Sequence, residues 1–240
     1  LLRHREVHAV RVRLEFDGRY AAMLSHEPKN YALQPYDGAL ILRGVAFRSS
    51  RAEPFGEDFL RRALRCLLAG DIPGVRDIYV ETVMALRRRA LPTRSVAAQV
   101  RLTKTPEQYL AARRRELPYE AMLASGRKHW ASGEQVRVYR AVGGRAGLLP
   151  EPEAGENESD PRDYDADFYA RQLRDTFAAR LVRALTPEDF AAVFADPGQP
   201  SLFAPSLADA RPVLTVLDEP EGEQPHSENP WVSPLPLGEG

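Results

Sequence analysis

The sequence predicts an α+β protein: an antiparallel sheet near the N-terminus, followed by a mostly helical region that contains a small strand. Three observations predict this class. In parts of the first fifty residues, apolar side chains recur at every second position. From Phe55 the apolar spacing becomes helical. After residue 205, proline, glutamate, glycine and serine dominate, which is typical of a disordered tail.

Two Asp-Gly pairs divide the predicted sheet. Residues 7–16 alternate apolar and polar side chains, as a half-buried strand does. Asp17-Gly18 favours a hairpin turn after this strand, and Asp37-Gly38 favours another turn before the last strand. The strands expected after the first turn are residues 19–25, 29–34 and 39–47.

Apolar stripes predict the helices that follow. In residues 55–69, phenylalanine, leucine and alanine recur every three or four positions, and arginines occupy the other side. Asp71 can cap a second helix at 72–89, which Pro92 ends. Thr105-Pro106 is typical of a helix start, and this helix is expected to run to residue 115. The remaining expectations are a strand at 134–141, an acidic loop at 150–163, a helix at 165–185 and a short helix at 187–194.

The composition excludes several classes of protein. A single cysteine, Cys66, in 240 residues rules out a disulfide framework and a thiolate zinc cluster. No window approaches about 18 uninterrupted apolar residues, so a transmembrane helix is not expected. The first residues form no apolar run and do not resemble a signal peptide. The chain does not begin with Met, which indicates an incomplete sequence, and the expected compartment is the cytoplasm.

The net charge of −1 conceals a strong segregation of charge. Residues 1–150 carry 27 Lys and Arg against 15 Asp and Glu, a balance of +12, whereas residues 151–240 carry 6 against 19, a balance of −13. Arginine dominates the basic part, and its planar fork suits phosphate groups. A GC-rich genome would also enrich arginine, but it would not separate the two signs of charge. A basic body with an acidic end is compatible with a nucleic-acid partner.

Short motifs follow one another in a specific order along residues 14–204. A Lys-x-Tyr signature, Lys29 and Tyr31, is preceded by Leu-Glu-Phe-Asp at 14–17 and followed by Leu-Ile-Leu-Arg-Gly at 40–44. Later motifs are Leu-Leu-Ala-Gly-Asp at 67–71, Leu-Thr-Lys-Thr-Pro-Glu-Gln-Tyr at 102–109, Gly-Glu-Gln-Val-Arg-Val-Tyr at 133–139 and Asp-Tyr-Asp-Ala-Asp-Phe-Tyr at 163–169. Together they resemble the palm and thumb of the family B DNA polymerases, with the bacterial DNA polymerase II type as the nearest relatives.

The resemblance implies an order of domains. Residues 1–50 correspond to the C-terminal edge of a palm, 51–204 to a complete thumb and 205–240 to a largely disordered tail. The family's Asp-Thr-Asp metal motif, its fingers and its exonuclease carboxylates are not found in this sequence. Phosphoryl transfer needs bridged metal ions, so the full-length enzyme is expected to use Mg²⁺ through ligands outside this chain. No catalytic or metal-binding residue is assigned, and an N-terminal polymerase portion, from the same gene or a separate subunit, is an expected partner.

Lys29 and Tyr31 are the first DNA contacts that the resemblance implies. It places them beside the minor groove of newly made primer–template duplex, where the acceptors look alike for every correct base pair. Contact there senses pairing geometry rather than sequence. Lys29 can also be a solvated surface lysine, and Tyr31 a sheet residue that packs on the thumb. Pro28 and Asn30 stand where the family often has cations, which weakens the expected grip.

Four more cations are expected to hold the phosphate backbone. Arg48 and Arg51 flank the palm–thumb junction, and a solvated loop is the alternative for both. Arg101 and Lys104 lie in the segment that meets the primer backbone in the family, and a structural role is the alternative. Phosphate contacts bind strongly without reading bases, which suits a thumb that lets DNA slide.

The other basic segments have simpler explanations. Trp130 follows Arg127, Lys128 and His129 and can stack on nucleic acid, but an anchor of the local core is favoured. The arginine triplets at 87–89 and 113–115 are expected near helix C-termini, where they complement the helix dipole.

The segment Gln199-Pro200-Ser201-Leu202-Phe203 resembles the pentapeptide that binds the bacterial sliding clamp. In this interpretation Gln199 orients an extended peptide, and Leu202 and Phe203 are its apolar anchors. The alternative is that the Leu-Phe pair packs back on the last helix of the domain.

One function is expected from these interpretations together. The chain is expected to be a fragment of a family B DNA-directed DNA polymerase, a nucleotidyltransferase, which grips primer–template duplex during replication or repair synthesis. A catalytically inactive relative that serves as a DNA- or clamp-binding module is the alternative from another class. A third interpretation, an unrelated globular domain with surface arginines, predicts no DNA affinity.

Overall fold

The structure is a computed structural model that describes residues 18–48, 52–152, 159–199, 207 and 210–213. Within these residues the chain forms two three-stranded antiparallel sheets and seven α-helices, so the predicted α+β class is confirmed. The strands are β1 (Tyr20–Glu27), β2 (Asn30–Pro35), β3 (Ile41–Arg43), β4 (Ala98–Arg101), β5 (Gln135–Arg140) and β6 (Ala146–Leu149). The α-helices are α1 (Pro54–Leu68), α2 (Ile72–Arg87), α3 (Thr93–Val96), α4 (Pro106–Ala111), α5 (Leu117–Ala124), α6 (Ala166–Gln172) and α7 (Pro187–Val193).

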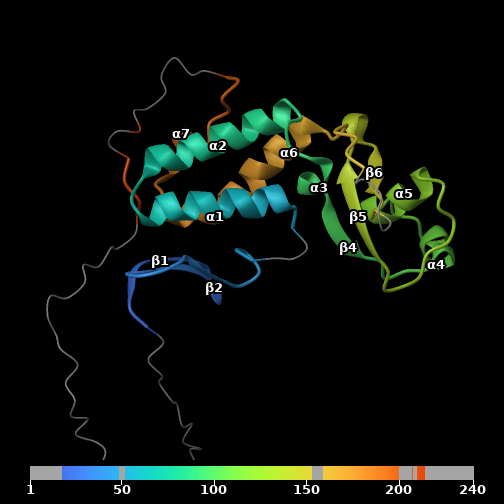
Figure 1. Cartoon of the computed structure of the whole chain (residues 1–240), viewed down its shortest axis with the longest axis horizontal. Helices are drawn as coiled ribbons and strands as arrows, with labels where there is room; N and C mark the ends of the chain where they lie inside the picture. Colours follow the sequence, from blue (N-terminus) through green and yellow to red (C-terminus); the bar gives the residue numbers. More distant parts are fainter. Residues whose placement is uncertain (1–17, 49–51, 153–158, 200–206, 208–209, 214–240) are drawn as a thin grey trace, which may run out of the picture.

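The first sheet lies beneath α1 and carries the N-terminal hairpin (Figure 1). Its strands run in the order β1-β2-β3, and the chain reverses between β1 and β2 at Pro28 and Lys29. Leu24, Ala32 and Leu42 are partners across the three strands, and they pack into the core on the α1 side. A shift of one residue would turn these side chains outward, so burial fixes the register of the hairpin.

The expectations for this sheet are met only in part. The strand expected at 7–16 and the residue Asp17 lie outside the described residues. The strand expected at 39–47 is too long, because β3 ends at Arg43. Gly44 has φ 83°, and its carbonyl accepts from the amides of Phe47 and Arg48. A tight turn therefore replaces the second half of the predicted strand.

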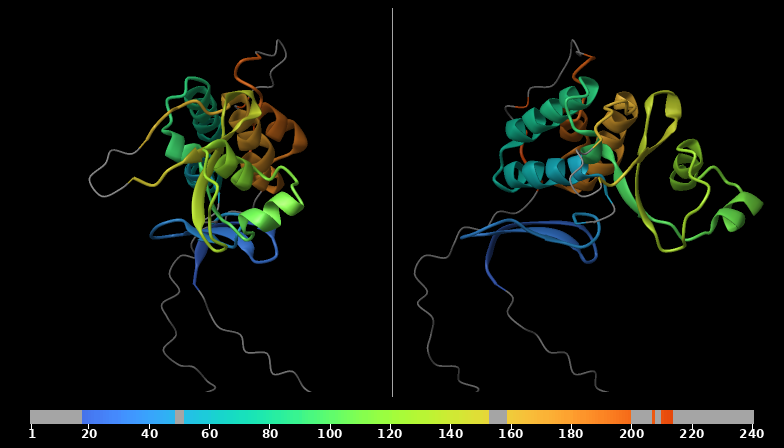
Figure 2. Two further views of the ribbon diagram at one scale, coloured as in Figure 1. Left: turned by 90° about the vertical axis from the view of Figure 1, so that its right-hand side faces the viewer. Right: turned by 45° about the vertical axis from the view of Figure 1, so that its right-hand side comes forward.

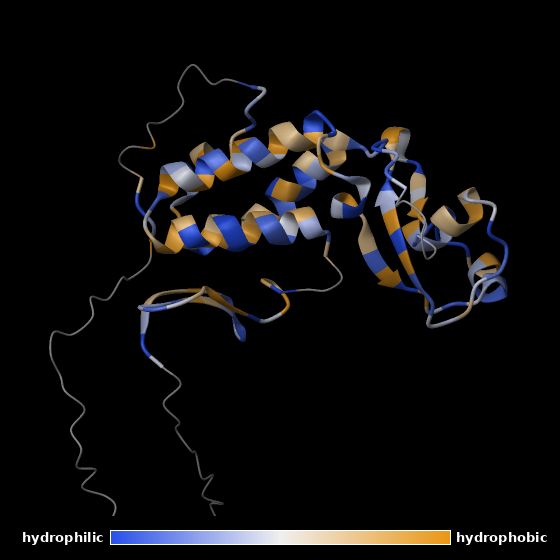
Figure 3. Ribbon diagram, viewed as in Figure 1, coloured by the Kyte–Doolittle hydropathy of each residue, from blue (hydrophilic) through white to orange (hydrophobic). Residues whose placement is uncertain are grey.

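The helices α1 and α2 form the centre of the first core. Asp71 caps α2 as predicted, since its carboxylate accepts from the amide of Gly74 at 2.9 Å. The rings of Phe59, Tyr79 and Phe194 meet edge to face between α1, α2 and the end of α7. Figure 3 shows hydrophobic and hydrophilic residues alternating along both helices, as expected for amphipathic helices that bury one side.

A second, smaller core lies between the second sheet, in the order β4-β5-β6, and the helices α4 and α5 (Figure 2). The rings of Tyr109 and Tyr119 stack at 4.5 Å in this core. The Tyr119 hydroxyl accepts from the amides of Thr103 and Lys104, at 3.0 Å each. Trp130 is only 7% exposed and donates to the carbonyl of Lys104 at 2.9 Å, so its prediction as a core anchor is confirmed.

Two predicted helices end differently in the structure. The helix expected to reach residue 115 is wrong in length: α4 ends at Ala111, and the arginines at 113–115 lie beyond it, not at its C-terminus. The chain must already extend at Glu116 to begin α5, whose second position is Pro118. The triplet at 87–89, in contrast, does lie at the end of α2.

The helix expected at 165–185 is not uniform. It consists of α6, a π-helical turn at Leu173–Phe177 and a 3₁₀ helix at Ala178–Ala184. The ring of Phe177 packs so closely on Gly56 of α1 that a Cβ there would lie 2.1 Å from it. The π-helical turn thus brings Phe177 into close contact with α1, which is distant from it in the sequence.

The predicted tail from residue 205 is described only at Leu207 and at residues 210–213. Leu207 and Ala210 pack on the first core, and the amide of Val213 donates to the carbonyl of Ala184 at 2.7 Å. Residues 214–240 lie outside the described part of the chain. None of the described helices is long and apolar enough to cross a membrane.

Candidate nucleic-acid interface

The tip of the β1–β2 hairpin rests on the turn that follows β3. The side-chain oxygen of Asn30 accepts from the amide of Ala46 at 2.9 Å. A Cβ at Gly44 would lie 2.3 Å from that oxygen and from the carbonyl oxygen of Lys29, so only glycine fits. Lys29 itself has φ 67°, a left-handed conformation that is uncommon for lysine. This arrangement leaves its side chain exposed, with no ion pair among the described residues.

A half-buried arginine connects the turn after β3 to the 3₁₀ helix at Ala178–Ala184. Arg180, from the 3₁₀ helix, donates to the carbonyl of Ala46 and lies over the ring of Phe177, 5.0 Å from its centre. Burial lowers the pKa of the Arg180 guanidinium, which nevertheless stays charged at neutral pH. The hairpin tip, the turn and the body therefore hold one another in place.

Three arginines line a cleft of about 370 Å³ between the first sheet and α1. They are Arg43 at the end of β3, the exposed Arg48 after the turn, and Arg61 of α1, and Glu57 is the acidic residue in the same lining. Arginines that border one cleft from different segments of the chain can together attract a phosphate. Arg51, the fourth cation expected at this junction, lies outside the described residues.

Tyr31 lies on the face of the first sheet that points away from α1. It is the register partner of Ser25 on β1 and of Arg43 on β3. Its neighbour Ala32 is the residue that packs toward the helices. Because side chains alternate along a strand, the half-buried Tyr31 does not take part in the core beneath α1.

Arg101 and Lys104 differ in their availability to a ligand. Arg101 is exposed at the end of β4, where its guanidinium lies beside Gly133 and forms no ion pair in the described part of the chain. Lys104 forms an ion pair with Glu116 at 2.5 Å, and its ammonium group lies over the ring of Tyr119. The positive charge of Lys104 is thus already balanced by Glu116 within the protein.

The structure divides the predicted contacts between the two sheets. The first sheet and its turn carry Lys29, Tyr31 and Arg48, and the second sheet region carries Arg101 and Lys104. In Figures 1 and 2, the first sheet and the C-terminal end of β4 project toward the same side of the molecule. A long ligand that lies along this side can reach both groups.

The residues just before the predicted clamp peptide are held in place by an ion pair. Arg87 at the end of α2 binds Asp196 through two hydrogen bonds of 2.7 Å, which hold the pKa of that carboxyl at about 2. The backbone amide of Gln199 donates to the carbonyl of Asp196, and the Gln199 side chain is exposed. Leu202 and Phe203 lie outside the described residues.

Sequence reasoning missed the contribution of Arg43 and Arg61 to the arginine cleft. Arg61 appeared only as part of the polar side of a helix, and Arg43 only as part of a strand motif. The two residues are far apart in the sequence, so no local pattern joins them. Only the folded chain shows that they border the same cleft.

No group of three or more His, Cys, Asp or Glu that could hold a metal occurs among the residues that the structure describes. The described carboxylates therefore do not fit a two-metal polymerase centre.

No protein-family model and no curated protein matches this sequence. Among solved structures, the chain is similar to the family B DNA polymerase from the hyperthermophilic archaeon Pyrobaculum calidifontis, with a TM-score of 0.56 and 18% identity. The similarity covers 72% of this chain and 22% of that polymerase, so the two share a fold over a minor part of the larger protein.

Proposed function

We propose that this chain is the palm edge and thumb of a family B DNA-directed DNA polymerase, and that it holds primer–template duplex without reading its sequence. The observation that carries this proposal is the fold that 72% of the chain shares with the archaeal family B polymerase. The order of motifs along residues 14–204 supports the same assignment.

The proposed grip has two parts. Lys29 and Arg48, with Arg43 and Arg61 in the arginine cleft, meet the duplex at the first sheet. Arg101 meets its backbone at the end of β4, and Lys104 joins only by exchanging Glu116 for a phosphate. Contacts of this kind neutralise phosphates and release counterions, so they bind every sequence alike. The ring of Tyr31, on the sheet face that points away from α1, contacts the duplex beside its minor groove.

Catalysis belongs to an N-terminal polymerase portion that brings the carboxylates for Mg²⁺. This chain then supplies the hold on the product duplex during replication or repair synthesis. Gln199, Leu202 and Phe203 form the proposed attachment to a sliding clamp, which keeps the polymerase on DNA.

The alternative function is a catalytically inactive, polymerase-derived module that binds DNA or the clamp. Both functions use the same DNA-binding residues, and neither requires metal ligands within this chain. The coding sequence upstream discriminates between the two, because an intact Asp-Thr-Asp motif supports the enzyme and its loss supports the module.

The grip is tested by fluorescence anisotropy with a labelled primer–template duplex and single alanine variants of the full chain. We expect Lys29→Ala, Arg48→Ala and Arg101→Ala each to weaken binding about equally for duplexes of unrelated sequence. Arg48→Ala and Arg101→Ala, which each remove a phosphate contact, should also flatten the dependence of log affinity on log salt by about 0.9.

Arg88→Ala is the matched control, because this exposed arginine at the end of α2 lies outside the proposed interface. It should leave the affinity nearly unchanged. Losses that depend on base sequence, or an equal loss in the control, would contradict the proposed grip.

A further inference from the structure

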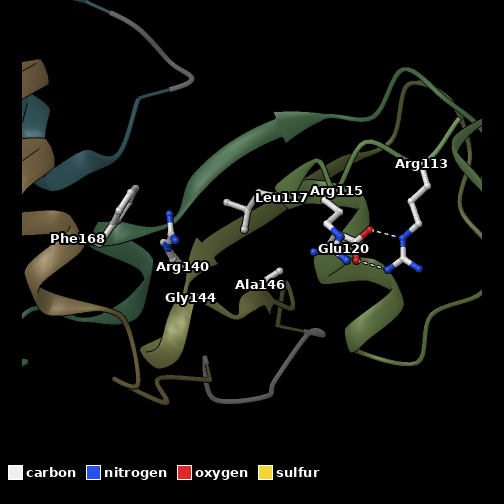
Figure 4. Close-up of a pocket in the computed structure, with 8 residues that line it drawn as sticks. All are labelled: Arg113, Arg115, Leu117, Glu120, Arg140, Gly144, Ala146 and Phe168. Carbon is white, nitrogen blue, oxygen red and sulfur yellow. Dashed lines mark hydrogen bonds and ion pairs between the residues drawn. The ribbon is translucent and has the colours of Figure 1, made fainter.

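An elongated pocket of about 600 Å³ lies at the seam between the two cores (Figure 4). Its volume falls within the range of about 300–1,000 Å³ that is usual for ligand sites. Phe168 and Arg140 lie at one end, Leu117 and Ala146 in the middle, and a group of charged residues at the other end. The pocket shares no residue with the arginine cleft beside α1.

The first end is built around Arg140, the last residue of β5. It lies on the same sheet face as Val136 and Val138, which pack against α5. Arg140 itself is only half-buried. Its guanidinium lies 4.6 Å from the centre of the Phe168 ring, and its Nε is buried without a hydrogen-bond partner among the described residues. Arg140 lines the pocket beside Gly144, and it has no carboxylate partner in the described part of the chain.

Arg113, Arg115 and Glu120 form the other end. Arg113 is used internally: its Nε donates to the Glu120 carboxylate at 2.6 Å, and this interaction helps hold the pKa of Glu120 at about 2. Arg115 has a left-handed backbone, φ 54°, and is exposed without an ion pair among the described residues. Arg115 also contributes to the lowered pKa of Glu120 through its positive charge. Each end of the pocket thus has one cation that forms no ion pair among the described residues.

The middle of the pocket is apolar. Leu117, at the first position of α5, is 38% exposed, which is high for a large hydrophobic side chain at such a junction. It borders the pocket together with Ala146 of β6 (Figure 4). A ligand that fits this order presents an anion, then an apolar body, then a second anion.

We propose that this pocket binds a single strand of nucleic acid, with one phosphate on Arg140, another on Arg115 and an intervening sugar or base against Leu117. The strand has this alternation of charged and apolar groups, and grooves that bind single strands combine cations with surfaces for bases. The lining carries three arginines and one glutamate, an excess of two positive charges, which matches two phosphodiesters. The site is separate from the duplex interface, so either proposal can fail without the other.

The test is the binding of a short fluorescein-labelled oligothymidine to the full chain, measured by anisotropy beside a blunt duplex. Arg115→Ala and Arg140→Met should each lower the affinity for the single strand about tenfold, because each removes charge-assisted hydrogen bonds. Each should also reduce the salt slope by about 0.7. Methionine retains apolar contact with Phe168, and a thermal melt verifies folding.

Arg114→Ala is the matched control, because it removes the same charge from the same linker at an exposed residue outside the pocket lining. It should change the affinity for the single strand less than twofold. The affinity for the duplex should be unaffected by the two pocket variants, whereas Arg48→Ala should lower it.

Competitors identify the ligand. Unlabelled oligothymidine should displace the probe, and thymidine monophosphate should do so only at far higher concentration, because it offers a single phosphate. Equal competition by polyglutamate would indicate a site for acidic peptides and would overturn the proposal. Loss of single-strand binding in the Arg114→Ala control, or unchanged binding in Arg115→Ala, would overturn it as well.

Discussion

The cations around the two sheets of this molecule differ in how many of them are paired. Around the second sheet, several basic side chains have a carboxylate partner: Lys104–Glu116, Arg113–Glu120, Arg127–Glu134 and Arg137–Glu151. Around the first sheet, Lys29, Arg43 and Arg48 have no ion pair within the described residues. The positive balance of the N-terminal part therefore overstates the charge that is available to an anionic ligand, because part of it is paired within the fold.

The two cores also differ in the side chains that fill them, and removing these side chains gives the largest expected effect. Phe59 in the first core and Met122 in the second are both fully buried. Phe59→Ala should lower the free energy of unfolding by about 3–5 kcal/mol and Met122→Ala by about 2–5 kcal/mol. The larger loss is expected for Phe59, because the larger side chain leaves the larger cavity. Urea unfolding followed by circular dichroism measures both. A larger loss of unfolding free energy for Met122→Ala than for Phe59→Ala would contradict this prediction.

The next effect concerns acid. The bond from Arg87 lowers the pKa of Asp196 to about 2, so the folded state favours the ionised carboxylate. This stabilisation is complete above the ordinary carboxyl pKa and disappears as the pH falls from about 4 to about 2. Because Asp196 is 39% exposed, solvent screening limits the contribution to about 1 kcal/mol. Thermal melts of the native chain and of Arg87→Met should differ above pH 4 and converge near pH 2.

Arg88→Met provides the control for the acid experiment, since Arg88 is exposed beside Arg87 and has no carboxylate partner in the described structure. Its melts should follow those of the native chain at every pH. A constant difference between Arg87→Met and the native chain down to pH 2 would show that packing, and not the ion pair, holds Asp196.

A smaller effect is expected at the cap of α2, which belongs to the first core alone. Asp71→Ala removes the hydrogen bond to the amide of Gly74 and should lower the free energy of unfolding by about 1 kcal/mol. Asp77→Ala, an exposed residue within the same helix, should change it by less than about 0.5 kcal/mol. Equal losses would mean that α2 does not depend on its cap.

The smallest effect addresses the paired cations of the second core. Glu116→Gln should release Lys104 and raise duplex affinity about threefold, since an exposed ion pair is worth less than about 1 kcal/mol. Glu107→Gln, an exposed acidic residue in the first turn of α4, is the control for a general loss of negative charge. Anisotropy at low salt measures both variants. An equal gain in both would mean that Lys104 has no special position on the DNA.

The sequence predicts the first core better than the second for a physical reason. The helices α1 and α2 are long, amphipathic and bounded by Pro, Gly and Asp, and these are local signals. The strands β4 and β6 have four residues each, and β4 pairs with a strand more than thirty residues away, as Gln99 does with Arg137. Such strands are stabilised by pairing and burial, which no short window of sequence contains.

The same limit applies to the candidate sites. Motif order identifies Lys29, Arg48 and Arg101 as candidates, and the structure leaves all three exposed. It does not reveal that Glu116 engages Lys104, because this partner comes from the start of another helix. Nor does it bring Arg115 and Arg140 to one pocket, since they approach from a linker and a strand. Availability of a charge is a property of the folded neighbourhood and not of residue type.

The most direct measurement is the affinity of the full chain for two primer–template duplexes of unrelated sequence across a salt series. We predict equal affinities at every salt concentration and a steep linear fall of log affinity with log salt, with a slope of about −0.9 for each phosphate contacted. A clear preference for one sequence, or an affinity insensitive to salt, would contradict a thumb that grips the DNA backbone.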